Sequence, residues 1–292
     1  MSEPGSDTET SPEDFPQTTS SLSADALQEA FEKHRVQTEA AIASGDAAAI
    51  KRLYVELGEL LDDALKGDAA SAPVLSLPET GPVVLGLMRG VSGLLIDAGC
   101  GPNPAMSIAL AREDPRRTMV GMDIGFGIVR IARAVAERAG VSFLPIVADL
   151  ESLPFRDGAF DGGVCDDTIE HLPNDARGVA ELARVMRRGA RAIVATPNRQ
   201  SAAVLARKAR DRIAGRKLPA STYYAASSHL REYTWPQADR LLERSFHITR
   251  RASVGWSDGG WKKRLATTAT ARGPMRRFAR MIVAEVEPVD RA

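Results

Sequence analysis

The sequence predicts an α/β protein in which a parallel sheet is covered by helices on both faces. Between residues 94 and 197, short apolar runs typical of strands alternate with segments whose apolar residues recur at helical spacing. A glycine-rich turn follows the first apolar run, in the stretch LLIDAGCGPNP at residues 94–104. Ligands of such sheets bind outside the carboxyl ends of the strands, where this turn would lie.

The chain ahead of this segment is predicted to form a tail, a helical hairpin and a linker. Residues 1–21 are rich in Ser, Thr, Pro and acidic residues, so we expect a disordered tail. Two segments with helical spacing follow, and Ser23 and Asp46 are placed to cap them, while Gly45 and Gly67 are placed to end them. We therefore expect a hairpin and a proline-containing linker over residues 22–80.

Residues 81–200 are predicted to be the core, and they open with a short apolar helix at VVLGLMRGV. The expected strands are LLIDA, TMVGMD, VSFLPIV, FDGGVCD and ARAIVAT, and the expected helices run from about Pro104 to Glu113, Gly127 to Ala139 and Asp175 to Met186. Residues 201–230 read as a basic, helical insert or lid. Residues 231–292 then supply one helix and two strands that would complete the sheet.

The composition is that of an ordinary globular protein, with 44% hydrophobic and 26% charged residues. No apolar run approaches the length of a transmembrane helix, and the N-terminus lacks the order of a signal peptide, so we expect a cytoplasmic protein without a transmembrane segment. Cys100 and Cys165 do not make a disulfide scaffold and are expected to be reduced.

The glycine turn itself favours a ligand other than a dinucleotide. Gly99 and Gly101 allow the backbone to approach a ligand, but two glycines alone fit a plain structural turn equally well. The dinucleotide fingerprint requires Gly or Ala where Pro104 stands, and the Gly-Lys-Ser/Thr of a phosphate-binding loop is absent. Instead Asp97 precedes the glycines, and its carboxylate would suit an ammonium group or bound water.

Acidic residues also follow the next two predicted strands. Asp123 could accept both hydroxyls of a ribose, or cap the helix that follows, or do both. Asp149 could accept a hydrogen bond from an exocyclic amine such as that of adenine, with Ile124 and Leu150 on either side of the ring. Because desolvated carboxylates are costly without a donor, three acids at successive strand ends favour a shared ligand site.

Four stretches now carry a family resemblance: LLIDAGCGPNP, VGMDIGFGIVRIAR, VADLESLPFRDGAFDGGVCDDTIEHLP and ELARVMRRGARAIVATPN. Over roughly residues 90–200 they resemble the successive motifs of class I S-adenosylmethionine-dependent methyltransferases, especially the small-molecule subgroup related to quinone-biosynthesis enzymes. The resemblance implies a Rossmann-like, doubly wound, mostly parallel sheet of seven strands whose last strand is antiparallel. It also implies S-adenosylmethionine as cofactor, bound at Asp97, Gly99, Gly101, Asp123, Asp149 and Asp166, and we expect Cys100 beside it.

The sequence departs from the family pattern at two places. RRGA at residues 187–190 stands where the family has Pro-Gly-Gly, which concerns a turn. Gly125 and Gly127 follow Asp123, and we expect them to loosen the start of the next helix. Neither departure argues against cofactor binding.

The candidate catalytic residues lie in DDTIEHLP, just after the fourth predicted strand. His171 has a suitable intrinsic pKa for a general base, with Asp167 beside it, although Glu170 and His171 also fit a structural role in holding the next loop. Asp167, Glu170 and His171 form D-x-x-E-H, which resembles the E-x-x-E-H of some quinone O-methyltransferases. This likeness raises the alternative of a divalent metal ion held by these three side chains.

Segments outside the core are expected to select the acceptor, which we predict to be a small molecule methylated at a hydroxyl. Residues 187–280 contain 22 basic and 5 acidic side chains, while residues 1–70 contain 5 basic and 15 acidic ones. The basic insert fits an anionic or lipid-linked substrate, or simply a solvated helix face; its cationic residues are Arg207, Lys208, Arg210, Arg212, Arg216 and Lys217. Tyr223, Tyr224 and His229 are candidates for lining the pocket, or ordinary packing residues.

Two other functions compete with a small-molecule methyltransferase. A non-catalytic module could retain the cofactor site and use the hairpin to bind a partner. A nucleic-acid methyltransferase fits the basic C-terminal third, but aromatic residues make up only 5% of the chain and no Asn/Asp-Pro-Pro-Tyr/Phe signature follows the fourth strand. We therefore expect no nucleic-acid partner, and the sequence favours no particular oligomeric state.

Overall fold

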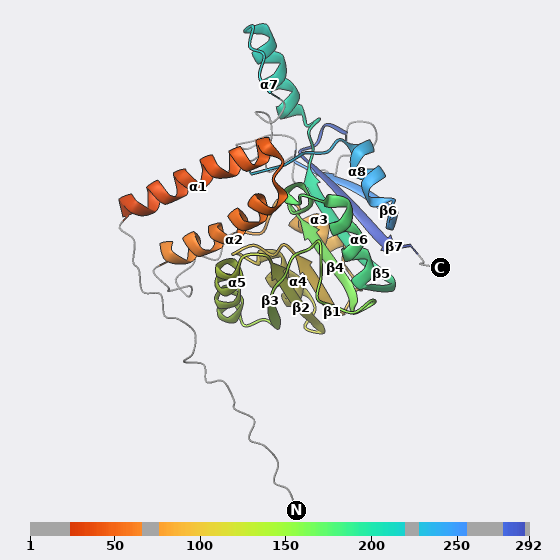
Figure 1. The fold of residues 1–292 in the computed structure, drawn as a ribbon. Helices are drawn as coiled ribbons and strands as arrows, with labels where there is room; N and C mark the ends of the chain where they lie inside the picture. The colour runs from red at the N-terminus through yellow and green to blue at the C-terminus, as the bar shows by residue number, and fades with distance from the viewer. Residues whose placement is uncertain (1–23, 66–75, 220–227, 256–276, 290–292) are drawn as a thin grey trace, which may run out of the picture.

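The computed structural model describes residues 24–65, 76–219, 228–255 and 277–289 of the chain (Figure 1). Within these residues the strands form one seven-stranded sheet in the order β3-β2-β1-β4-β5-β7-β6. The strands are β1 Gly93–Ala98, β2 Arg117–Asp123, β3 Phe143–Val147, β4 Phe160–Asp166, β5 Met186–Pro197, β6 Phe246–Val254 and β7 Met281–Pro288.

The pairing confirms the predicted mostly parallel sheet with an antiparallel last strand. β7 runs antiparallel to both β5 and β6, and the remaining neighbours pair in parallel. The order of the strands reverses at β1, which has β2 on one side and β4 on the other. In open α/β sheets this reversal opens a crevice at the carboxyl ends of the strands, where ligands bind.

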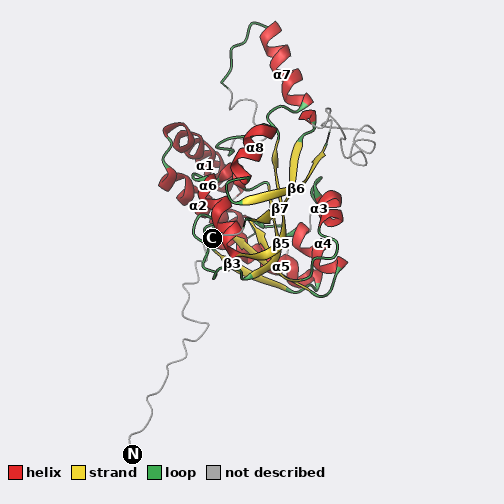
Figure 2. Cartoon of the chain, turned by 90° about the vertical axis from the view of Figure 1, so that its right-hand side faces the viewer, coloured by secondary structure: helices red, strands yellow, loops and turns green. Residues whose placement is uncertain are grey.

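Helices cover the sheet on both faces (Figure 2). α3 and α4 pack on one face, and α6 and α8 pack on the other. Neighbouring strand residues point to opposite faces, so that Leu95 belongs to the apolar core beneath α3 and α4, and Ile96 belongs to the core beneath α6 and α8. The helices are α3 Gly81–Leu87, α4 Ala105–Glu113, α5 Phe126–Ala139, α6 Asp175–Val185 and α8 Trp235–Leu242.

The N-terminal hairpin consists of α1 Ala24–Ser44 and α2 Ala47–Ala64, as the sequence predicts. Gly45 ends the first helix with a φ of 70°, and the Asp46 carboxylate caps the second by accepting a hydrogen bond of 3.0 Å from the Ala49 amide. Ser23 and Gly67, the two other predicted boundaries, lie outside the described residues. Gly45 and Asp46 thus end the first helix and cap the second, as predicted.

The hairpin is attached to the core through a close contact between α2 and α5. A Cβ atom on Gly127 would overlap with the carbonyl oxygen of Gly58, so the absence of a side chain at Gly127 allows the two helices to approach; a Cβ atom on Gly58 would lie 3.2 Å from Ile128, a tight contact. Arg130 of α5 also pairs with Asp62 of α2. Gly127 therefore makes room for α2, a role that the sequence-based interpretation, in which Gly127 loosens the start of α5, did not include.

The basic insert contains α7, Ala202–Ile213, which stands away from the sheet at the top of Figure 1. Ile213 at its end is 88% exposed. None of the helices in the described ranges has both the length and the apolar character that crossing a bilayer requires. The predicted tail of residues 1–21 and the residues Tyr223 and Tyr224 fall outside the part of the chain that the structure describes.

Candidate functional site

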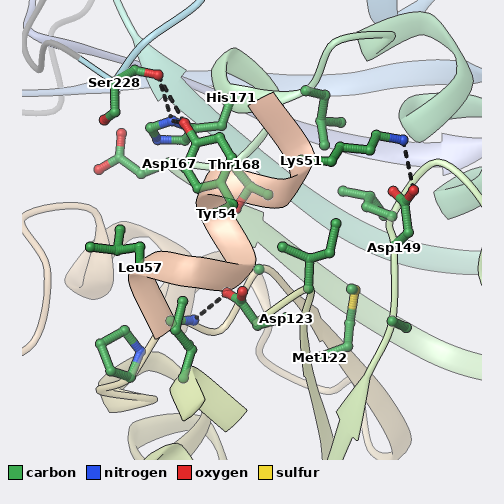
Figure 3. Close-up of a pocket in the computed structure, with 18 of the residues that line it drawn as sticks. Lys51, Tyr54, Leu57, Met122, Asp123, Asp149, Asp167, Thr168, His171 and Ser228 are labelled. Carbon is green, nitrogen blue, oxygen red and sulfur yellow. Dashed lines mark hydrogen bonds and ion pairs between the residues drawn. The ribbon is translucent and has the colours of Figure 1, made fainter. Parts of the chain in front are cut away.

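A cavity of about 310 Å³ lies where the strand order reverses, between the carboxyl ends of the strands and helix α2. Figure 3 shows its two walls, with Asp123, Asp149 and Thr168 from the core facing Lys51 and Tyr54 from the hairpin. The lining residues from the core are Gly99, Gly101, Pro102, Met122, Asp123, Ile124, Ile128, Ala148, Asp149, Leu150, Asp167, Thr168, His171, Leu172 and Pro173, and those from elsewhere are Lys51, Tyr54, Leu57 and Ser228.

The glycine turn after β1 forms part of the cavity wall. Gly99 and Gly101 have φ values of 85° and 60°, a left-handed conformation that favours glycine. A Cβ atom on Gly99 would overlap with the Thr168 side chain, whereas at Gly101 no atom lies within 4 Å of that position. The backbone at Gly101 therefore borders open space and can approach a ligand closely.

Asp97 supports this turn from beneath and does not line the cavity. Its side chain is buried, and one carboxylate oxygen accepts a hydrogen bond of 2.6 Å from the Ser107 hydroxyl on α4. Burial raises the pKa of Asp97 to about 6, although the hydrogen bond from Ser107 acts in the opposite direction. Cys100 is likewise buried outside the cavity lining, and burial raises the pKa of its thiol.

Asp123 joins the end of β2 to the glycine turn and faces the cavity. Its two carboxylate oxygens accept hydrogen bonds from the amides of Gly101, at 3.3 Å, and Gly125, at 3.2 Å. Gly125 is the residue ahead of α5, so the carboxylate both supports the start of this helix and borders the cavity. Burial raises its pKa, although the backbone amides oppose this shift.

Asp149, after β3, is held by a lysine from the hairpin. The ammonium group of Lys51 on α2 lies 2.7 Å from a carboxylate oxygen of Asp149 and 2.7 Å from one of Glu151. Burial lowers the pKa of Lys51, but the hydrogen bonds to the two carboxylates outweigh this effect and the net shift is upward. The single cation balances one of the two negative charges in this corner of the cavity and links α2 to the core.

Asp166 and Asp167, at the end of β4, have different surroundings. Asp166 accepts a hydrogen bond of 2.5 Å from the Thr80 hydroxyl, is not part of the cavity lining, and has its pKa raised to about 7 by burial. Asp167 has a φ of 52° and lines the cavity. Of the two acids, only Asp167 is in a position to meet a ligand.

His171 lies at the cavity within a hydrogen-bonded chain. Its Nδ1 is 2.6 Å from the Tyr54 hydroxyl and 3.3 Å from the Ser228 carbonyl oxygen, to which the hydroxyl donates at 2.9 Å. Because a carbonyl can only accept, this arrangement favours a proton on Nδ1 and a lone pair on Nε2. Burial, together with the nearby His229, lowers the pKa of His171 to about 4, so the imidazole is neutral at physiological pH.

Glu170 and His229 complete a group with His171. The ligating atoms of these three side chains all lie within 4.8 Å of one another. The set predicted from the sequence included Asp167 instead of His229, and Asp167 is absent from the group that the described residues form. Its charge nevertheless acts on Glu170, whose pKa is raised mainly by burial and further by this neighbour.

The structure thus places the predicted cofactor residues in two groups. Those that line the cavity are Gly99, Gly101, Asp123, Ile124, Asp149 and Leu150, and those outside its lining are Asp97, Cys100 and Asp166. Three residues that reach the cavity from α2, namely Lys51, Tyr54 and Leu57, were not among those predicted from the sequence. The signal that could have indicated them is Gly58, a helix-disfavouring residue in the middle of α2 that marks a close helix contact.

Comparisons with known proteins agree with this geometry. A family model described as a methyltransferase domain matches residues 96–194. The malonyl-[acyl-carrier protein] O-methyltransferase of Geobacter sulfurreducens is 36% identical over 92 residues, which cover 32% of this chain and 34% of that one. A ubiquinone biosynthesis O-methyltransferase of Xylella fastidiosa is 30% identical over 112 residues, covering 38% and 44%. The chain thus spans less than half the length of these relatives.

Solved structures share the fold at low sequence identity. Magnesium protoporphyrin IX methyltransferase from Synechocystis, solved with bound S-adenosylhomocysteine, is 19% identical with a TM-score of 0.50, over 72% of this chain and 82% of that one. The [4+2]-cyclase SpnF is 17% identical with a TM-score of 0.55, over 80% and 96%. The name of this second protein specifies a different reaction, so the fold alone does not determine the chemistry.

Fold and cavity define a doubly wound α/β protein with a ligand site at the reversal of strand order. Residues 96–194 match the family model of a methyltransferase domain, and over this part of its length the chain is similar to O-methyltransferases.

Proposed function

We propose that this chain transfers a methyl group from S-adenosylmethionine to a hydroxyl group of a small-molecule acceptor. The observation that carries the proposal is the convergence of the Gly99–Gly101 turn, Asp123 and Asp149 on one cavity at the point where the strand order reverses. The short matches to two O-methyltransferases support oxygen as the methylated atom.

The residues present fit the cofactor. The open space at Gly101 would admit the amino-acid portion, the carboxylate of Asp123 suits the two ribose hydroxyls, and Ile124 and Leu150 offer apolar walls to the base. Asp149 gives one oxygen to Lys51 and the other to the Glu151 amide, and each oxygen retains a further lone pair for an exocyclic amine. Asp97 serves the site by holding the turn through Ser107.

The chemistry then depends mainly on alignment. When bound, the cofactor supplies a methyl group that is already activated on a sulfonium. Closing the cavity with α2 excludes water and fixes the acceptor, and such positioning can contribute about 7–11 kcal/mol. The Nε2 lone pair of His171 can accept the proton of the acceptor hydroxyl. Because its pKa is lowered to about 4, it is a weak base, and its contribution falls toward the lower end of the about 10²–10⁴ in rate that is typical of general base catalysis.

A second cavity, of about 220 Å³, offers room for the acceptor between α1 and α2. It shares Tyr54, Leu57 and Ser228 with the first cavity and is otherwise lined by Phe31, His34, Arg35 and Thr38. Phe31 and Leu57 favour an apolar or aromatic body. The basic helix α7, with Leu205 39% and Ile213 88% exposed, supports an anionic or lipid-linked acceptor that is reached at a membrane surface.

The test is a screen of acceptors that reads out release of S-adenosylhomocysteine. The panel pairs phenols with their O-methylated counterparts, with and without a carboxylate or a long alkyl chain. We expect release with at least one free phenol and none with its methylated counterpart. Saturable binding of S-adenosylmethionine without release from any acceptor would contradict an O-methyltransferase and favour a non-catalytic module.

A further inference from the structure

Three side chains able to bind a metal converge beside the cavity. Glu170 and His171 come from the short 3-10 helix η3, Ile169–His171, and His229 comes from the loop ahead of α8. Their ligating atoms all lie within 4.8 Å of one another. Glu170 and His229 are buried, and His171 lines the cavity.

In both histidines Nδ1 already has an oxygen partner, which leaves Nε2 as the ring nitrogen available to a metal ion. Nδ1 of His229 lies 3.0 Å from a carboxylate oxygen of Glu232, whose side chain is 1% exposed. Since a carboxylate accepts, this contact places the His229 proton on Nδ1, as the Ser228 carbonyl does for His171. Metal-binding histidines are typically oriented in this manner by a carboxylate or a carbonyl group on the other ring nitrogen.

The third side chain has an unsatisfied oxygen. Glu170 is fully buried, and one of its carboxylate oxygens accepts a hydrogen bond of 2.9 Å from the Thr196 hydroxyl. The other oxygen has no hydrogen-bond partner within the described part of the chain. A buried carboxylate oxygen without a partner is costly, and a cation held between this carboxylate and the ligating nitrogens of the two histidines would satisfy it.

We propose that Glu170, His171 and His229 bind a divalent metal ion of the zinc class. Two imidazoles and one carboxylate form a donor set that zinc accepts, leaving a fourth position for a water molecule or a substrate oxygen. With metal–ligand bonds of about 2.0–2.2 Å, the ligand atoms of a tetrahedral site are roughly 3.3–3.6 Å apart. Since the three ligating atoms lie within 4.8 Å of one another, the longest of their separations would have to shorten by about an ångström on metal binding. The side of the site at His171 faces the cavity.

The site differs from the one that the sequence motif suggests. The D-x-x-E-H pattern would use Asp167, whereas the geometry replaces this residue with His229, which lies 58 residues beyond His171. The two sets therefore make opposite predictions for variants of Asp167 and His229. The inference rests on these side chains alone. It is an alternative to the role of His171 as general base, because one Nε2 lone pair cannot both bind a metal ion and accept a proton.

The experiment uses the full chain, stripped with a chelator and titrated with Zn²⁺ by calorimetry, with elemental analysis after dialysis. Wild type is expected to bind one ion per chain. His229→Ala should weaken binding at least about tenfold, while Asp167→Asn should stay within about twofold of wild type. Glu232→Gln, which keeps all three ligands and alters only the orienting partner, should cost about 10-fold.

The absorption spectrum of the Co²⁺-substituted protein reports the ligands directly, because a tetrahedral Co²⁺ site with nitrogen and oxygen ligands gives visible bands. These bands should disappear in His229→Ala. Far-ultraviolet circular dichroism and binding of S-adenosylhomocysteine establish that each variant is folded. Absence of Zn²⁺ binding by folded wild type would overturn the proposal and favour a proton shared between Glu170 and the imidazoles. Loss of binding in Asp167→Asn with retention in His229→Ala would overturn it in favour of the motif-based set.

Discussion

The two walls of the cavity differ in chemistry and in how they are positioned. The core wall presents a glycine turn and the carboxylates of Asp123 and Asp149, each placed by the end of a parallel strand. The hairpin wall presents Lys51, Tyr54 and Leu57, which are placed by the packing of α2 on α5. The difference supports the proposal that the core wall receives the cofactor, while the hairpin wall closes the cavity and shapes the acceptor site.

We expect the largest effect on stability and methyl transfer when the hairpin wall is detached from the core wall. In Gly127→Ala, the added Cβ would overlap with backbone atoms of Gly58, which cannot move aside without shifting α2. We expect a loss of about 1–3 kcal/mol in the free energy of unfolding, as for other overpacked sites, together with a large loss of methyl transfer. Denaturant titration and the rate of S-adenosylhomocysteine release measure the two effects.

Gly86→Ala is the matched control, because no atom lies within 4 Å of the position of its Cβ on α3. This variant should be as stable as wild type or slightly more stable, since alanine favours a helix over glycine. Equal stability and activity of the two variants would show that the hairpin does not depend on the glycine contact.

A smaller effect is expected from removing the charge on the hairpin wall. Lys51→Met leaves the carboxylates of Asp149 and Glu151 without the cation that lies 2.7 Å from each. We expect a loss of about 1 kcal/mol in stability, between the values for exposed and buried ion pairs, and weaker closure of α2 over the cofactor. Denaturant titration and the Michaelis constant for S-adenosylmethionine report these changes.

Arg133→Met removes an ion pair of similar length from the surface of α5, where Arg133 and Glu137 are both more than half exposed. No measurable loss of stability is expected there, because exposed pairs contribute little. A Lys51 variant that behaves like this surface control would mean that the pair does not fix α2 over the cavity.

The sequence predicts the core wall better than the hairpin wall, for physical reasons. Strand ends of a parallel sheet gather at one edge, so Asp123 and Asp149 could be assigned to the same crevice. Which way each acid points was not predictable, because Asp97 and Asp166 turn to the hydroxyls of Ser107 and Thr80, and these pairs form only in the folded chain. The capping residues show where the hairpin helices begin and end, but not the face on which they dock.

The contact between His171 and His229 was likewise not predictable from the sequence. His171 was a candidate because it follows a strand end, whereas His229 was only one of several residues considered for the pocket. Their contact depends on the path of the chain from β5 to α8, and nothing in the local sequence around either residue specifies it. Only the folded chain brings the second histidine to Glu170.

The central claim is that the carboxylate of Asp123 receives the cofactor at the reversal of strand order. The most direct measurement is calorimetric titration of S-adenosylhomocysteine into wild type, Asp123→Asn and Asp166→Asn, the last being an acid at a neighbouring strand end outside the cavity lining. We expect wild type to bind one S-adenosylhomocysteine per chain. The affinity should fall about 10–100-fold in Asp123→Asn, because hydrogen bonds to a charged group are lost. The affinity of Asp166→Asn should stay within about twofold of wild type. Absence of binding by wild type, or equal affinity in all three proteins, would contradict the account.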